Sequence, residues 1–169
     1  MSRVDVYMFP CYDCGDAEGQ VSDTVSYLQS NNAKYTAFWL DIEGTQYWST
    51  VKSNNQDFFN SLVSEAQKLG QTIGVYTSES QWNSIMGGSF TAGSKFPLWY
   101  PHYQIPADPS FDDFSSFAGW TSPAMKVCFF FLFVCLGGAD VALMQQYSGD
   151  DTDCSVNLDQ NYALSLKYT

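Results

Sequence analysis

Short apolar runs alternate with longer stretches of helical periodicity over the first hundred residues of the chain. We predict a strand where apolar residues alternate or run together between Pro, Gly or Asn residues, and a helix where they recur every three or four positions. The four predicted strands cover residues 4–9, 35–40, 72–77 and 96–100, and the three predicted helices centre on residues 21–28, 58–69 and 81–86. This order is typical of βα units joined by right-handed crossovers on a parallel sheet.

The length of the chain limits what these units can build. With 169 residues the chain is one domain, or part of one, and it has enough apolar residues for a buried core. A full (β/α) barrel usually takes about 250 residues and a minimal one about 200. We therefore predict an α/β fold, a modified (β/α) TIM-like barrel with fewer units than the full form.

The ends of the second helix and the last third of the chain carry weaker signals. Asn54 or Asn55 is the predicted N-cap of that helix, and Gly70 ends it. Three prolines predict an irregular loop over 101–109, polar residues predict a loop over 147–154, and 155–162 is predicted as a short final strand. The apolar run 127–136 has no periodicity, and its ten residues are fewer than the about 20 that cross a bilayer.

Two carboxylates follow the second predicted strand, whose residues 35–40 are almost wholly apolar. Because side chains alternate along a strand, Asp41 and Glu43 point to one side and Ile42 to the other. The carboxyl ends of parallel strands are where α/β barrels hold their catalytic groups. The plain alternative is a strand end that becomes polar as it meets solvent, and the spacing alone does not decide between the two.

Net charge excludes one class of partner. The chain carries −11 with seven Lys and Arg residues, so it offers little to bind phosphate, and no nucleic acid partner is expected. No basic start followed by an apolar segment is visible, so no signal peptide is predicted, and no membrane partner is expected.

Aromatic residues are numerous, and most belong to a core, although exposed rings stack on sugars. Tyr47, Trp48, Trp82 and Trp120 remain open between these two roles.

Five cysteines suggest an oxidising compartment. The pair Cys11 and Cys14 is compatible with a redox motif, half a zinc site or a structural disulfide. Zinc needs two further ligands, and His102 is the only histidine, so no metal or other cofactor is expected. A structural bridge is favoured, either between Cys11 and Cys14 or from one of them to Cys154. His102 has no positioned Ser or Cys pattern beside it, so loop packing or a substrate contact is the simpler interpretation.

Several ordered motifs resemble glycoside hydrolase family 25, and more narrowly its eukaryotic lysozymes from protists and nematodes. These motifs are VDVYMFPCYDCG, WLDIEGTQYWS, GVYTS, FPLWYPHY and QYSGDDTDCSVNLDQNY. The likeness covers nearly the whole chain except about residues 127–145. It implies a modified (β/α) barrel that cleaves the β-1,4 bond between N-acetylmuramic acid and N-acetylglucosamine in bacterial peptidoglycan.

The resemblance also implies roles for single residues. The family's Asp-x-Glu falls on Asp41 and Glu43, so Glu43 is the expected general acid and Asp41 the partner carboxylate. The family's closing Asp-x-Asn puts Asp159 at the rim of the same pocket. The aromatic residues that match sugar-binding positions of the family are Tyr7, Tyr76, Trp99 and Tyr100.

Two departures from the family pattern are expected to matter. The chain begins at what resembles the family's third strand, so the barrel is predicted to be incomplete at its N-terminus and to lack an active-site Asp. Residues 127–145 have no family counterpart and are predicted to be an atypical apolar insertion. The expected protein is a monomeric lysozyme that acts on peptidoglycan in an extracellular or lysosomal setting. The alternatives are an inactive truncated homologue that at most binds glycan, and a redox protein that uses Cys11 and Cys14.

Overall fold

The computed structural model describes residues 4–102, 110–127, 143–153 and 156–163, and beyond Lys126 it describes the backbone alone. All strands of this part of the chain form one sheet whose order follows the sequence. The strands are β1 (Val6–Met8), β2 (Phe38–Asp41), β3 (Ile73–Tyr76), β4 (Leu98–Pro101), β5 (Met125–Val127), β6 (Leu143–Asp153) and β7 (Val156–Ala163). Strands β1 to β6 pair in parallel, and β7 is antiparallel to β6. The four predicted strands of the first hundred residues are present, and the parallel βα pattern is confirmed.

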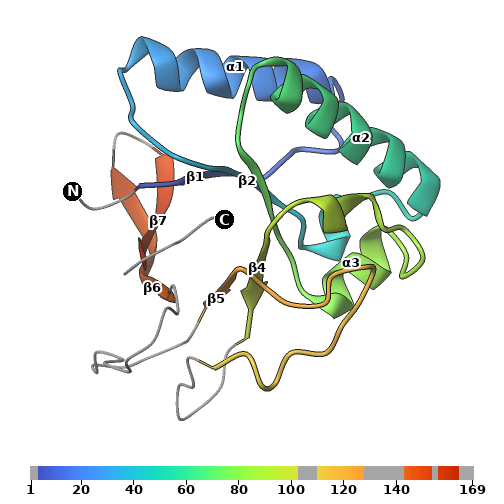
Figure 1. Cartoon of the computed structure of the whole chain (residues 1–169). Helices are drawn as coiled ribbons and strands as arrows, with labels where there is room; N and C mark the ends of the chain where they lie inside the picture. Colours follow the sequence, from blue (N-terminus) through green and yellow to red (C-terminus); the bar gives the residue numbers. More distant parts are fainter. Residues whose placement is uncertain (1–3, 103–109, 128–142, 154–155, 164–169) are drawn as a thin grey trace.

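The helices connect successive strands in the predicted order. They are α1 (Ala17–Ser30), α2 (Lys52–Lys68) and α3 (Glu79–Ile85), with short 3-10 turns η1 (Thr45–Tyr47) and η2 (Ala92–Lys95). Figure 1 shows α1 and α2 side by side along one side of the sheet, with α3 near the ends of the strands. None of the helices in the described part of the chain is long and apolar enough to cross a membrane.

The predicted cap of α2 is wrong. The helix begins one turn earlier, after Val51, which makes no side-chain capping bond. Asn55 lies inside the helix and is fully buried. Its amide accepts a hydrogen bond from the Ser49 N–H (3.0 Å) and donates to the carbonyls of Ser49 and Ile85 (both 2.9 Å). A buried polar group needs partners, and these bonds join α2 to the end of α3.

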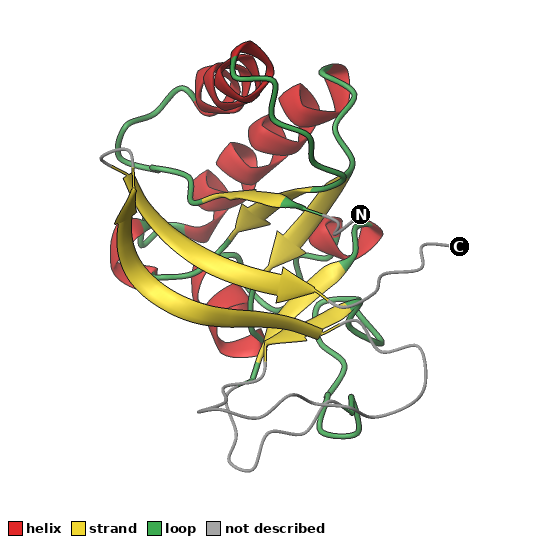
Figure 2. Cartoon of the chain, turned by 90° about the vertical axis from the view of Figure 1, so that its left-hand side faces the viewer, coloured by secondary structure: helices red, strands yellow, loops and turns green. Residues whose placement is uncertain are grey.

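The loop predicted over residues 147–154 is also wrong. Residues 147–154 were expected to form a polar loop, but β6 extends to Asp153 and pairs with β7 over most of its length. Figure 2 shows the two as a long curved ribbon. Ladder hydrogen bonds to a neighbouring strand outweigh the low β-propensity of Ser, Gly and Asp. The final strand predicted at 155–162 is present as β7, whereas the core of the predicted insertion, 128–142, lies outside the described residues.

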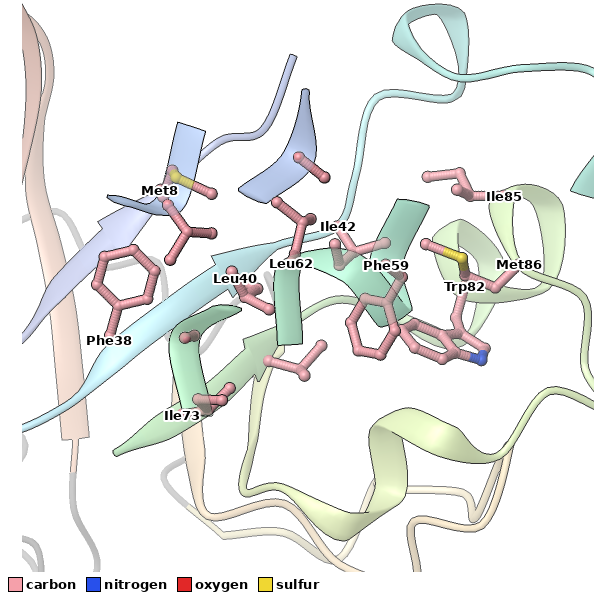
Figure 3. Packing of buried hydrophobic residues seen from close by; sticks show 14 of the residues in the cluster. Met8, Phe38, Leu40, Ile42, Phe59, Leu62, Ile73, Trp82, Ile85 and Met86 are labelled. Carbon is pink, nitrogen blue, oxygen red and sulfur yellow. The ribbon is translucent and has the colours of Figure 1, made fainter. Parts of the chain in front are cut away.

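The two faces of the sheet carry different cores. Phe38, Leu40 and Ile42 are fully buried on the face that the helices cover. Figure 3 shows this cluster, with Phe38 at one end near Met8 and with Phe59 of α2 and Trp82 of α3 at the other end. The opposite face, called here the aromatic face, carries a second cluster. Its members are Tyr7, Ala37, Trp39, Tyr76, Trp99 and Met125.

Trp39 lies on the aromatic face directly over a glycine of the next strand. It is in register with Gly74 of β3, and a Cβ added to Gly74 would lie 2.2 Å from the Trp39 ring. Asp5 holds the indole from the other side: its Oδ2 accepts from Trp39 Nε1 (3.2 Å), and its Oδ1 accepts from the Ala37 N–H (3.0 Å). The aromatic face is therefore fixed by both packing and hydrogen bonds.

Candidate active site

Strand β2 brings Asp41 to the aromatic face, and Glu43 follows just beyond the end of the strand. Its residues alternate, so Trp39 and Asp41 lie opposite Phe38 and Leu40. Asp41 is the last residue of β2, is only 7% exposed, and pairs in register with Tyr76. Glu43 follows two residues later and is partly exposed. One carboxylate is thus largely withdrawn from water while the other is accessible to a ligand.

Two buried side chains hold the backbone after β2. The Thr77 hydroxyl donates to the Ile42 carbonyl (2.7 Å), and the Trp48 Nε1–H donates to the Glu43 carbonyl (2.9 Å). Thr77 is 0% and Trp48 is 6% exposed. Buried hydrogen bonds are costly to break, so these contacts fix the direction in which Glu43 leaves the strand.

Gln81 of α3 supplies a third contact on the same segment. Its Oε1 accepts a hydrogen bond from the Gly44 N–H at 3.0 Å. Gly44 adopts φ 71° and ψ 70°, a left-handed conformation that glycine adopts without steric cost. Thr77, Trp48 and Gln81 together are called the Glu43 clamp below. Sequence reasoning missed the role of Gln81, because no local pattern marks a contact across 37 residues.

Three of the four predicted sugar-binding aromatics lie on the aromatic face with Asp41. Tyr76 and Trp99 are in register across β3 and β4, with ring centroids 4.7 Å apart. Tyr7 of β1 packs against the same cluster and is in register with Trp39. Tyr76 (9% exposed) and Trp99 (5%) are largely buried, so they form a wall beside Asp41 more than an open surface.

The structure does not bring Tyr100 to this face. It follows Trp99 in β4 and therefore points to the helix-covered side, where its ring packs on Phe114 (5.2 Å). Its hydroxyl hydrogen-bonds with His102 Nδ1 (3.0 Å). Burial raises the pKa of Tyr100 above its usual 10.0, and the negative charges of Asp113 and Glu79 raise it further by smaller amounts.

A buried ion pair ties the loop after β4 to β5. Lys126 is 0% exposed, and its Nζ lies 2.7 Å from Asp113 Oδ1 and 3.0 Å from the Ser110 carbonyl. Asp113 Oδ2 lies 3.1 Å from His102 Nε2. His102 thus packs on the Tyr100 ring and contacts Asp113, which agrees with loop packing, one of the two interpretations that the sequence left open.

Asp159 lies in β7, where the backbone alone is described. The neighbouring residues Leu158 and Gln160 pair with Asp151 and Ser148 of β6. Its predicted place at the pocket rim therefore stays a prediction. Cys154, the third disulfide candidate, lies outside the described residues.

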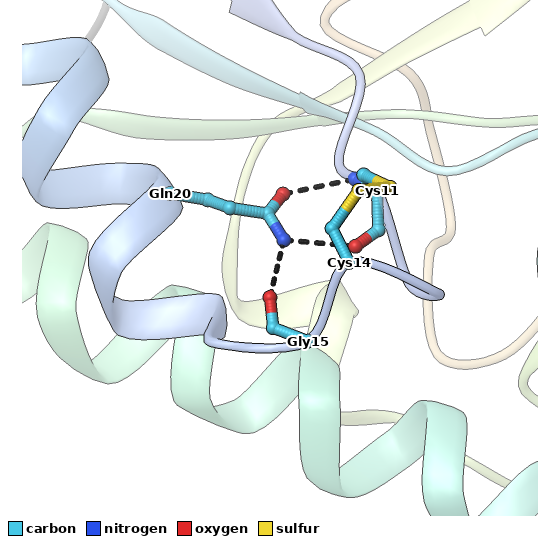
Figure 4. The surroundings of a disulfide bond; sticks show 4 residues. All are labelled: Cys11, Cys14, Gly15 and Gln20. Carbon is cyan, nitrogen blue, oxygen red and sulfur yellow. Dashed lines mark hydrogen bonds between the residues drawn. A yellow bond between two sulfur atoms is a disulfide. The ribbon is translucent and has the colours of Figure 1, made fainter.

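The structure places a disulfide between Cys11 and Cys14, one of the pairings that the sequence left open. Figure 4 shows Gln20 of α1 beside it. The Gln20 side chain accepts from the Cys11 N–H (2.9 Å) and donates to the carbonyls of Cys11 (2.8 Å) and Gly15 (2.6 Å). The loop that leads from β1 to α1 is thereby held at both ends. Within the described part of the chain, no group of three or more His, Cys, Asp or Glu residues could hold a metal ion.

The chain is similar to known lysozymes in sequence. The family model described as "Lysozyme-like protein 1" matches residues 1–127. "Probable GH family 25 lysozyme 2" of Dictyostelium discoideum is 56% identical over 123 residues, which cover 73% of this chain and 56% of that protein. "Probable GH family 25 lysozyme 4" of the same organism is 43% identical over 159 residues, covering 94% of this chain and 64% of that protein. The chain thus spans less than two thirds of the length of these relatives.

A solved structure shares the fold. The family GH25 lysozyme from Aspergillus fumigatus superposes with a TM-score of 0.57 at 16% sequence identity. The match covers 95% of this chain and 67% of that one. The predicted modified barrel type is therefore confirmed, although the barrel is not closed: in the described residues the sheet begins at β1 and ends at β7 with no pairing between them.

Proposed function

Because this chain belongs to the glycoside hydrolase family 25 lysozymes, we propose that it hydrolyses the β-1,4 bond between N-acetylmuramic acid and N-acetylglucosamine in bacterial peptidoglycan. The observation that carries the proposal is the placement of Asp41 and Glu43 at the carboxyl end of β2. Bacterial peptidoglycan is the proposed partner. The proposed setting is extracellular or lysosomal, and the proposed state is a monomer.

In the proposed reaction Glu43 is the general acid. Its carboxyl group gives a proton to the glycosidic oxygen while the bond from that oxygen to the anomeric carbon breaks. Positive charge develops on the sugar ring, and the Asp41 carboxylate stabilises it. Water then supplies the hydroxyl group at the anomeric carbon and returns a proton to Glu43.

The surroundings of the two acids differ, and the more accessible one is the proposed proton donor. A general acid must come within hydrogen-bond reach of the glycosidic oxygen, so accessibility favours Glu43 for that role. Asp41 is nearly excluded from solvent beside the Tyr76 and Trp99 wall, whereas Glu43 is partly exposed and held by the Glu43 clamp. Asp159 is proposed to complete the rim, as the family motif implies.

The second candidate is a chain that binds glycan without cleaving it. The open sheet favours it, because in the described residues β1 pairs with β2 alone and offers one unpaired edge. Both candidates use the same face, so a binding assay does not separate them. Hydrolysis does.

The test is loss of turbidity of a bacterial cell-wall suspension with the full chain, Glu43→Gln and Glu18→Gln. The control Glu18 is exposed on α1 and is removed with the same change of charge. We expect clearing by the parent chain and by Glu18→Gln, and none by Glu43→Gln. Equal clearing by all three removes Glu43 from the mechanism, and no clearing by the parent chain favours the glycan-binding candidate.

A further inference from the structure

Two exposed aromatic rings meet beside the candidate acid. Among the side chains that the structure describes, the exposed large apolar residues are Val4, Phe9, Tyr27, Tyr47 and Val51. Only two of these form a ring pair with each other: the rings of Phe9 (41% exposed) and Tyr47 (54%) meet edge to face, with centroids 5.7 Å apart. Single exposed apolar residues are ordinary, but a contacting pair at a candidate site points to a ligand.

Both rings lie close to the residue that follows Glu43. A Cβ added to Gly44 would lie 2.7 Å from the Tyr47 ring and 3.5 Å from the Phe9 ring. The absence of a side chain at Gly44 therefore allows both rings to approach the backbone there. They lie one residue from the candidate acid, while the predicted aromatics Tyr76 and Trp99 are largely buried.

Both rings are carried by ordered elements. Tyr47 is in η1, and its N–H donates to the Gly44 carbonyl (2.8 Å), while the next residue, Trp48, holds the Glu43 carbonyl. Phe9 directly follows β1 and precedes Pro10, which is buried. Rings held in place before binding lose little conformational entropy when a ligand arrives.

We propose that Phe9 and Tyr47 form a platform for one uncharged hexopyranose ring of a glycan chain, adjoining the bond that Glu43 would protonate. The axial C–H groups of such a ring make one sugar face apolar, and an aromatic ring offers a complementary surface. This inference rests on the proposed function and names a binding subsite for it. The platform is too small for a protein partner, which usually buries about 800 Å² on each side.

The net charge of the chain is a reason for an uncharged binding platform. The chain carries −11, and the peptide stems of bacterial walls are also anionic, so long-range attraction does not bring the two together. Stacking on an uncharged sugar face is not opposed by this repulsion. An uncharged aromatic subsite therefore lets an acidic protein bind an anionic polymer through its neutral part.

The experiment measures binding without hydrolysis, in full-length chains that carry Glu43→Gln. The probe is a peptide-free tetrasaccharide of alternating N-acetylglucosamine and N-acetylmuramic acid, titrated by calorimetry. We expect Phe9→Ala and Tyr47→Ala each to raise the Kd about 3- to 10-fold. Tyr47→Phe, which keeps the ring, should restore the affinity that Tyr47→Ala loses. The control Tyr27→Ala removes an exposed ring (65% exposed) from α1 and should leave the Kd unchanged.

The outcomes separate the platform from the proposed function. A Kd unchanged in both alanine variants, or a probe that does not bind the Glu43→Gln chain at all, overturns the platform. Hydrolysis of cell walls by the parent chain is measured separately and decides the proposed function. Thermal unfolding of each variant shows whether the fold is kept, and a weakened Kd counts for the platform only in a variant that unfolds cooperatively near the parent temperature.

Discussion

Replacing Gln81 by Leu tests whether the Glu43 clamp positions the acid. Leucine has a similar size but no acceptor, so the Gly44 N–H loses its 3.0 Å hydrogen bond. An unsatisfied buried donor costs about 1–3 kcal/mol, and because Gly44 is partly exposed we expect about 1 kcal/mol of unfolding free energy. The effect on catalysis should be larger, since a displacement of about 1 Å at a reacting group can cost about 100-fold.

The assay is cell-wall hydrolysis kinetics over a range of pH, combined with urea unfolding. We expect kcat to fall about tenfold or more in Gln81→Leu with a small change in KM, because the acid is displaced while the sugar contacts remain. Gln81→Glu keeps an acceptor oxygen and should recover most of kcat. Gln67→Leu, at an exposed position of α2, is the matched control and should behave like the parent chain. A kcat in Gln81→Leu within twofold of the control would refute the positioning argument.

Three further predictions concern packing and pH. Gly74→Ala should lower the unfolding free energy by about 3 kcal/mol in urea titrations, because its Cβ would lie 2.2 Å from the buried Trp39 ring, and an unchanged midpoint would contradict this packing. The pKa of Tyr100 is higher in the folded chain than in the unfolded chain, where it is about 10. The neutral phenol therefore contributes fully to the stability of the fold below pH 10, and this contribution is lost as the pH rises through the folded pKa. Tyr100→Phe should therefore flatten the loss of stability measured between pH 9 and 11, and an equally steep loss would contradict the assignment. Cell-wall hydrolysis should be fastest at acidic pH, where protonation of carboxylates reduces the repulsion caused by the charge of −11, and a rate maximum above neutrality would contradict that view.

Local pattern was sufficient to predict the parallel units of the fold. The apolar run before Asp41 and the helical stripe around Phe59 reflect burial on one or both faces, and burial is what periodicity records. The same alternation places Asp41 on the face opposite Leu40. The sequence therefore predicted the face on which Asp41 leaves the sheet, and the direction of the Glu43 side chain stays a prediction.

Contacts between distant residues were not predictable in the same way. Asn55 resembles a helix cap by its residue type, but its amide accepts a hydrogen bond from the Ser49 N–H and donates one to the carbonyl of Ile85, which lies 30 residues away. Gln81 likewise looks like an ordinary helix residue until its bond to Gly44 is seen. Polar side chains that satisfy a remote backbone group leave no periodic signal.

Strand β6 and Tyr100 show two other limits of prediction from the sequence. The polar residues of β6 have low β-propensity, and its pairing with β7 decides its conformation. The family resemblance implied sugar-binding roles for both Trp99 and Tyr100, yet neighbours in a strand point to opposite faces, so the two rings lie on opposite sides of the sheet.

The most direct test of the proposed muramidase activity of Glu43 is to identify the bond that is cleaved. Purified peptidoglycan is incubated with the full chain and with Glu43→Gln, and the new reducing ends are identified by borohydride reduction and mass spectrometry. We expect the parent chain to produce reducing N-acetylmuramic acid and Glu43→Gln to produce none. New reducing ends of N-acetylglucosamine, or equal release by the two chains, would contradict it.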